Sequence, residues 1–93
     1  MIINGKRVYV LLSKHEALKE FIGMTIKAHR QKKNISQEKL GEIIGLDGNN
    51  LGRIERGEHL PHLITYFKLT NALDIDHKNY QEQIITLLKE EDV

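Results

Sequence analysis

Most of the chain carries apolar residues at the three- and four-residue intervals that place side chains on one face of a helix. This spacing predicts five amphipathic helices. Their apolar positions are Leu18, Phe21, Ile22 and Ile26; Leu40, Ile43 and Ile44; Leu51 and Ile54; Leu63, Tyr66, Phe67, Thr70 and Leu73; and Tyr80, Ile84, Leu87 and Leu88. Only the start differs, where the pair Asn4-Gly5 precedes a β-rich run. We therefore expect an all-α, compact five-helix domain preceded by a short β-strand or hairpin.

Polar residues mark the ends of the predicted helices. Four helices have a residue suited to cap their N-terminus, namely Ser13 (in a capping box with Glu16), Ser36, Asp47 and Asp76. Asn34 suits a left-handed stop after the first helix. Pro61, the only proline, suits the first turn of the fourth helix, because an N–H at that position has no helical partner to lose.

Length and composition exclude several classes of protein. The 93 residues are enough for one domain with a modest core. The absence of cysteine rules out disulfides and thiolate zinc sites. The longest apolar run near the start, residues 8–12, is too short for a signal peptide or a membrane span. We expect a cytoplasmic protein that does not associate with membranes and needs no cofactor.

The charge of the chain is unevenly distributed. Residues 1–56 contain 11 Lys/Arg and 6 Asp/Glu, a balance of +5, whereas residues 57–93 contain 3 Lys/Arg and 7 Asp/Glu, a balance of −4. The two parts sum to the net charge of +1. Such asymmetry favours a face that binds a polyanion, although chance scatter of charges produces the same pattern in some chains.

The segment from Gln37 to Arg56 has the pattern of two helices joined by a tight turn. Gly41 is small where the second helix crosses the first, and Gly45 stands where the turn needs a positive φ. Asp47 can cap the second helix. Apolar residues occupy the remaining diagnostic places, which are Leu40, Ile44, Leu46, Leu51 and Ile54. The segment therefore predicts a helix-turn-helix unit.

Four further stretches extend this pattern into a family resemblance. The sequences "IGMTIKAHR", "ISQEKLGEIIGL", "LGRIERGEHLP" and "LTNALDI" resemble the phage-repressor and Cro-type (XRE-like) helix-turn-helix family over residues 22–75. The resemblance implies a transcriptional regulator that binds double-stranded operator DNA, usually as a homodimer on a palindromic site. Residues 13–75 would form this domain, with an N-terminal segment of residues 1–12 and a C-terminal amphipathic helix of residues 76–93 that contributes to dimerisation.

The resemblance also implies roles for individual residues. Arg30 is expected to pair with Glu55 as a structural ion pair. The residues expected to face base edges in the major groove are Gly48, Asn49 and Arg53. Those expected near DNA phosphates are Gln37, Asn50, Arg56, Arg30 and Lys27. The chemistry supports this assignment in part, because asparagine pairs with adenine and arginine with guanine, whereas Gly48 offers no side chain.

Other interpretations of the sequence are weaker. Asp47, Asn49 and Glu58 have nearly the spacing of a calcium-binding EF-hand loop, but Leu51 stands where a ligand is needed. His59 and His62 flank Pro61 and do not complete a metal site. No acid–base cluster indicates an enzyme. We therefore expect a sequence-specific repressor, with an antitoxin or restriction–modification controller of the same fold, or a protein-interaction module without specific DNA binding, as alternatives. A toxin or an anti-repressor is the expected kind of protein partner.

Overall fold

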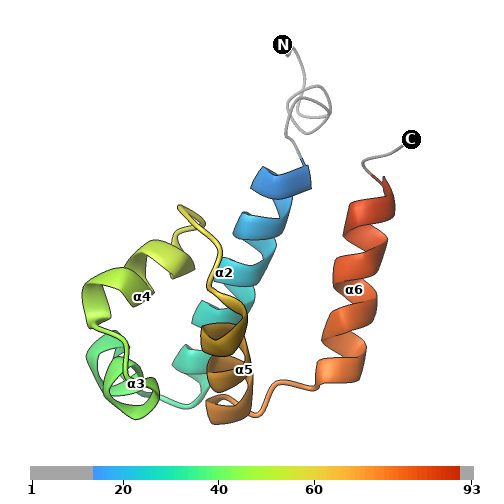
Figure 1. Ribbon diagram of the computed structural model, residues 1–93. Coiled ribbons are helices and arrows are strands. Elements are labelled where there is room, and N and C mark those ends of the chain that lie inside the picture. The colour runs from blue at the N-terminus through green and yellow to red at the C-terminus, as the bar shows by residue number, and fades with distance from the viewer. Residues whose placement is uncertain (1–13, 91–93) are drawn as a thin grey trace.

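The computed structural model describes residues 14–90, which contain five α-helices and no strand (Figure 1). The helices are α2 (Lys14–Lys32), α3 (Gln37–Ile44), α4 (Gly48–Glu55), α5 (Leu63–Ala72) and α6 (His77–Glu90). The expected all-α fold with five helices is therefore confirmed. The predicted N-terminal strand or hairpin and the Ser13 cap lie outside the described residues.

The residues that limit the helices act largely as their chemistry predicts. The side chain of Ser36 accepts a hydrogen bond from the Lys39 N–H, and the side chain of Asp47 accepts one from the Asn50 N–H. Asp76 accepts one from the Lys78 N–H at the start of α6. Asn34, with φ of 58°, ends α2 in the left-handed conformation. The order of helices and turns is thus set by local capping chemistry.

The core lies where α2, α3, α4 and α5 meet. Its most deeply buried apolar side chains are Ile26, Leu40, Leu51 and Leu69, one from each of these helices. α2 is the central element, because it packs against α4 on one side and against α6 on another (Figure 1). The predicted apolar stripes of α2 and α6 therefore face one another.

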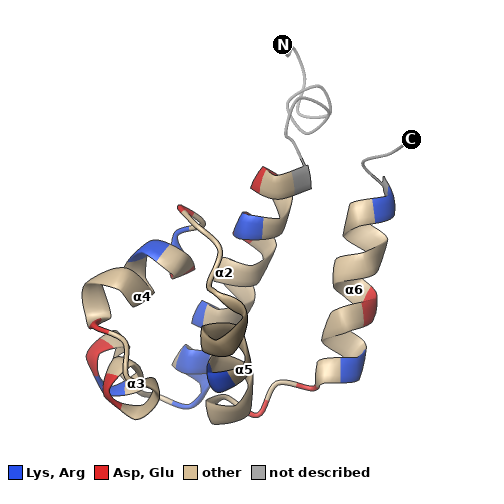
Figure 2. Ribbon diagram, viewed as in Figure 1, with Lys and Arg blue, Asp and Glu red and all other residues tan. Residues whose placement is uncertain are grey.

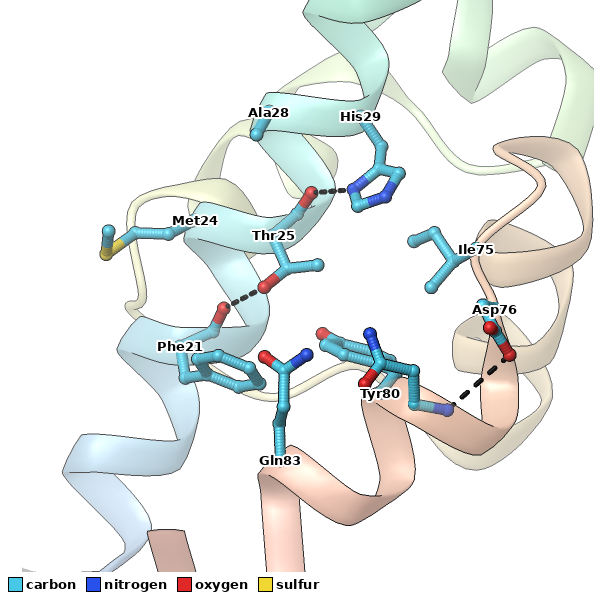
Figure 3. Close-up of a pocket in the computed structure, with 10 residues that line it drawn as sticks. Phe21, Met24, Thr25, Ala28, His29, Ile75, Asp76, Tyr80 and Gln83 are labelled. Carbon is cyan, nitrogen blue, oxygen red and sulfur yellow. Dashed lines mark hydrogen bonds between the residues drawn. The ribbon is translucent and has the colours of Figure 1, made fainter. Parts of the chain in front are cut away.

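Tyr80 is the main contact of α6 with the rest of the domain. Its ring lies 5.5 Å from that of Phe21 on α2 and 6.0 Å from that of Tyr66 on α5. The Tyr80 hydroxyl is buried and has no hydrogen-bond partner among the described residues. It lies beside a hollow between α2 and α6 (Figure 3). Burial raises the pKa of the Tyr80 phenol above its usual value.

Two predictions about the helices are wrong. Pro61 is not in the first turn of α5, which begins at Leu63 after the extended His62. Leu60 packs against the core three residues before the helix begins. Ile43, predicted on the buried face of α3, is 56% exposed. The buried face is formed by Leu40, Gly41 and Ile44 instead, since the Leu46 carbonyl lies where a Cβ on Gly41 would be.

Candidate nucleic-acid interface

The turn between α3 and α4 fixes the direction of the second helix. Gly45 has φ of 78°, and the N–H groups of Gly45 and Leu46 both donate to the carbonyl of Gly41, each at 2.8 Å. Asp47 then begins α4, and its second carboxylate oxygen accepts a hydrogen bond from the Asn50 side chain at 3.0 Å. The Asn50 amide is therefore engaged at the helix start. To contact a phosphate, the Asn50 amide must break its hydrogen bond with Asp47 or use its second N–H group.

One side of α4 is buried and the opposite side is exposed. Leu51, Gly52, Ile54 and Glu55 are buried, and they hold the helix on α2 and α3. Asn49 and Arg53 are exposed. Because they are four residues apart, their side chains lie on the same face of the helix. α4 thus presents an amide and a guanidinium outward from a rigid support.

A polar hollow lies between the first turns of α3 and α4. It is lined by Arg30, Ser36, Gln37, Glu38, Gly48 and Asn49. The structure therefore brings together four residues that the sequence assigned to DNA contacts. Glu38 was not among those assigned. Its Cγ is 3.3 Å from where a Cβ on Gly48 would be, so Glu38 fills the space beside this glycine.

A buried ion pair joins α2 to the C-terminal end of α4. Arg30 donates from Nε to Oε2 of Glu55 at 2.7 Å and from Nη2 to Oε1 at 3.1 Å. Gln37 donates from its side chain to the same Oε1 at 2.9 Å. The hydrogen bonds with Glu55 raise the pKa of Arg30. Glu55 thereby connects α2, α3 and α4, and the Gln37 amide nitrogen is bound before any phosphate approaches.

A second charged cluster follows the end of α4. Arg56 donates from Nε to Oε2 of Glu58 at 2.6 Å, and the Arg53 Nε lies 3.4 Å from Oε1 of the same carboxylate. The hydrogen bond with Arg56 holds the pKa of Glu58 below its usual value, and Glu58 in turn raises the pKa of Arg56. The role of Glu58 was missed in the sequence. The signal that points to it is the helix-ending Gly57, which turns the next residue back over the helix.

The remaining charged candidate, Lys27, lies on α2. Lys27 is exposed and shares a helix face with Arg30, three residues later, but it does not line the polar hollow. Lys33, directly after α2, forms a 2.7 Å ion pair with Asp74. Along residues 37–58 there are five acidic and three basic side chains, interleaved on α3 and α4 (Figure 2). The motif itself is therefore not a uniformly basic surface.

The calcium-loop interpretation conflicts with the backbone. Residues 48–55 form a helix, Asp47 caps it, and Glu58 pairs with two arginines. Its supposed ligands therefore do not converge on one point. Among residues 14–90, no group of three or more His, Asp or Glu side chains is arranged to hold a metal ion. No helix in this part of the chain is long and apolar enough to span a membrane.

Comparison with known proteins agrees with this geometry. A helix-turn-helix family model matches residues 26–78, which include α3 and α4 and most of the packing around them. The chain belongs to this helix-turn-helix family, of the XRE type. The matched region ends at the start of α6.

Three curated relatives share this region. The HTH-type transcriptional regulator SutR of Escherichia coli is 32% identical over 70% of this chain, but the alignment spans only 36% of SutR. Control protein C.SmaI of Serratia marcescens is 37% identical over 61% of this chain and 68% of its own length. An uncharacterized HTH-type transcriptional regulator of Bacillus subtilis, YgzD, is 34% identical over 54% of this chain and 76% of its own length.

Proposed function

We propose that this protein is a sequence-specific DNA-binding transcriptional regulator. The observation that carries the proposal is the exposed pair Asn49 and Arg53 on one face of α4, whose other face is fixed by buried residues. A helix presented in this way enters the major groove, where an asparagine amide pairs with adenine and an arginine with guanine. In this proposal, the amide and guanidinium groups that line the polar hollow at the first turns of α3 and α4 contact the phosphate backbone.

The protein acts in this proposal as a homodimer on a palindromic operator. The support is an apolar surface on α5, formed by Leu63, Ile64 and Phe67, which are 67%, 69% and 51% exposed. Three large apolar side chains within five residues on one helix favour burial against a second protein surface. Association through α5 would pair two α4 helices about a twofold axis and select an operator with matching symmetry.

Repression is the proposed effect on transcription, and a controller role is the second candidate. The similarity to control protein C.SmaI, which extends over 68% of that protein, favours a restriction–modification controller over an antitoxin. A neighbouring methyltransferase gene would support the controller role, and a neighbouring toxin gene would support the antitoxin role. A reporter carrying the operator within its promoter measures whether the protein lowers or raises transcription.

Selection from a random duplex library tests the proposal directly. The purified protein should enrich duplexes that share a palindromic consensus with half-sites about one helical turn apart. Enrichment of no consensus would exclude sequence-specific binding and favour the protein-interaction module. A consensus without symmetry would retain the DNA-binding role and exclude the symmetric dimer.

A further inference from the structure

The turn after α4 places one carboxylate beside two arginines that the proposed function directs toward DNA. Gly57 has φ of 76° and reverses the chain. The Gly57 N–H donates to the Ile54 carbonyl at 3.0 Å, and the Glu58 N–H donates to the Arg53 carbonyl at 2.9 Å. This pair of bonds is a Schellman motif, in which the residue after the glycine returns to the third-last residue of the helix.

Residues in those two places of the motif frequently make an apolar contact. Here they are Glu58 and Arg53, so the apolar contact is replaced by an ion pair. Because the Glu58 backbone is hydrogen bonded to that of Arg53, the two residues stay close together and the carboxylate can reach the guanidinium. The backbone therefore places the Cα of Glu58 beside Arg53, and the contacts with the two arginines hold its carboxylate there.

The atoms used by Glu58 determine what the arginines can still do. Both contacts are to Nε, one from Arg56 and one from Arg53. The hydrogen bond that Glu58 accepts comes from Nε of Arg56, and Nε is also the atom of Arg53 that lies closest to the carboxylate. An arginine held through Nε keeps its terminal fork for guanine or for phosphate. Glu58 thus holds both side chains without occupying the groups that recognise DNA.

We infer that Glu58 is a specificity-determining residue that positions Arg53 and Arg56 for DNA recognition. The inference rests on the proposed DNA-binding function. Free arginine side chains lose rotamer entropy when they bind, and a carboxylate paired with both of them reduces that loss for Arg56 and, through the longer contact, for Arg53. The same negative charge opposes binding to the phosphate backbone of any sequence. Glu58 therefore increases discrimination between sequences and lowers affinity for DNA in general.

Substitution of Glu58 by glutamine separates these two effects. E58Q keeps the size of the side chain and the backbone hydrogen bond but removes the charge. Duplexes carrying the selected consensus are compared with duplexes in which only the base pair contacted by Arg53 is changed. At low salt, E58Q is expected to bind both duplexes more tightly than the unmodified protein does. The ratio of its affinities for the two duplexes is expected to be roughly threefold to tenfold smaller. The log–log salt slope should steepen by about one.

E42Q is the matched control, because Glu42 on α3 is exposed and pairs with Lys39, not with either arginine. It changes the net charge equally and is expected to leave the affinity ratio unchanged. In the free protein, the Nε–H resonances of Arg53 and Arg56 should lose dispersion in NMR spectra of E58Q but not of E42Q. Thermal unfolding shows whether each variant is folded.

The outcomes distinguish the inference from the proposed function. If E58Q raises affinity for both duplexes equally and keeps their ratio, Glu58 is only a charge and the positioning role is excluded. If E58Q weakens binding to every duplex, the opposition to phosphate is excluded. Failure of the unmodified protein to select any consensus would instead overturn the proposed function itself.

Discussion

Arg30 and Glu55, 25 residues apart in the chain, join α2 to the end of α4 through two side-chain hydrogen bonds. Their side chains are only 11% and 1% exposed. Two charges removed from water in this way depend on one another, because either one alone would be buried without a partner. The position of α4 therefore depends on an electrostatic contact as well as on apolar packing.

Loss of Arg30 should consequently be severe. Arg30→Ala leaves the Glu55 carboxylate buried with only Gln37 as a side-chain partner, and we expect a loss of about 3–5 kcal/mol in the free energy of unfolding. Lys33→Ala is the control, since it breaks the exposed pair with Asp74 and should cost less than about 1 kcal/mol. Urea unfolding measures both. Equal losses would show that the Arg30 pair contributes no more than a surface contact.

Gly23 should tolerate no side chain. A Cβ at this position on α2 would collide with the Ile54 carbonyl and lie 2.7 Å from that of Glu55. Gly23→Ala must push α2 away from α4, which we expect to cost about 1–3 kcal/mol. Gly48→Ala, where the nearest neighbour is the flexible Glu38 side chain at 3.3 Å, should be neutral or stabilise the fold by up to about 1 kcal/mol. A melting temperature for Gly23→Ala at or above that of the unmodified protein would exclude the close approach.

Arg53 and Arg56 should differ in what they contribute to DNA binding. Arg53→Ala is expected to relax one position of the consensus by about 1–3 kcal/mol, because the lost contact is with a base. Arg56→Ala should weaken binding to all sequences and make the salt slope shallower by about one, because the lost contact is with phosphate. Gln37→Ala should also weaken binding to all DNA sequences to the same extent. Fluorescence anisotropy with matched duplexes measures the affinity of each variant. If the two arginine variants lose affinity in the same way across these duplexes, the assignment of Arg53 to a base and Arg56 to phosphate is wrong.

The apolar surface of α5 should control oligomeric state. Ile64→Lys places a charge among Leu63 and Phe67, and we expect it to shift the protein from dimer to monomer in sedimentation equilibrium. Ile43→Lys introduces the same charge at an exposed apolar position on α3 and should leave the dimer intact. A dimer that survives Ile64→Lys would place the interface elsewhere.

Tyr80 should make stability fall in alkaline solution. Its folded pKa is raised by burial above the unfolded value of about 10, so the folded protein retains the phenolic proton that the unfolded chain releases. This contribution to stability is present below pH of about 10 and is lost as the pH rises further. Tyr80→Phe should reduce the alkaline loss and, at neutral pH, be neutral or stabilising, because the removed hydroxyl has no partner among the described residues. A clear loss at neutral pH would indicate a hydrogen bond to water or to the Thr25 side chain.

Local chemistry made much of this fold predictable. Ser36, Asp47 and Asp76 cap helices because their side chains reach amides within three residues, and such short-range bonds are visible in the sequence. Asn34 is predictable because asparagine adopts a positive φ more readily than most residues. The Arg30–Glu55 contact was expected only because the family resemblance places the two positions together.

Features that depend on tertiary packing or on the path of the backbone were not predictable. Ile43 has helical spacing, but the close approach at Gly41 turns it outward. Pro61 precedes α5 because Leu60 is drawn to the core. Gly23 faces the end of α4, a contact between residues 31 and 32 positions apart in the chain that no local pattern reveals. The pairing of Glu58 with Arg53 and Arg56 requires the reversal at Gly57 to be known first.

The central position of α2 has a thermodynamic consequence. This helix contacts α4 closely at Gly23 and through the ion pair of Arg30, and it contacts α6 along a different face. If α4 binds DNA as proposed, a molecule that displaces α2 relative to α4 by binding at α6 would therefore change the free energy of that binding. By linkage, DNA must change the affinity for that molecule by the same factor.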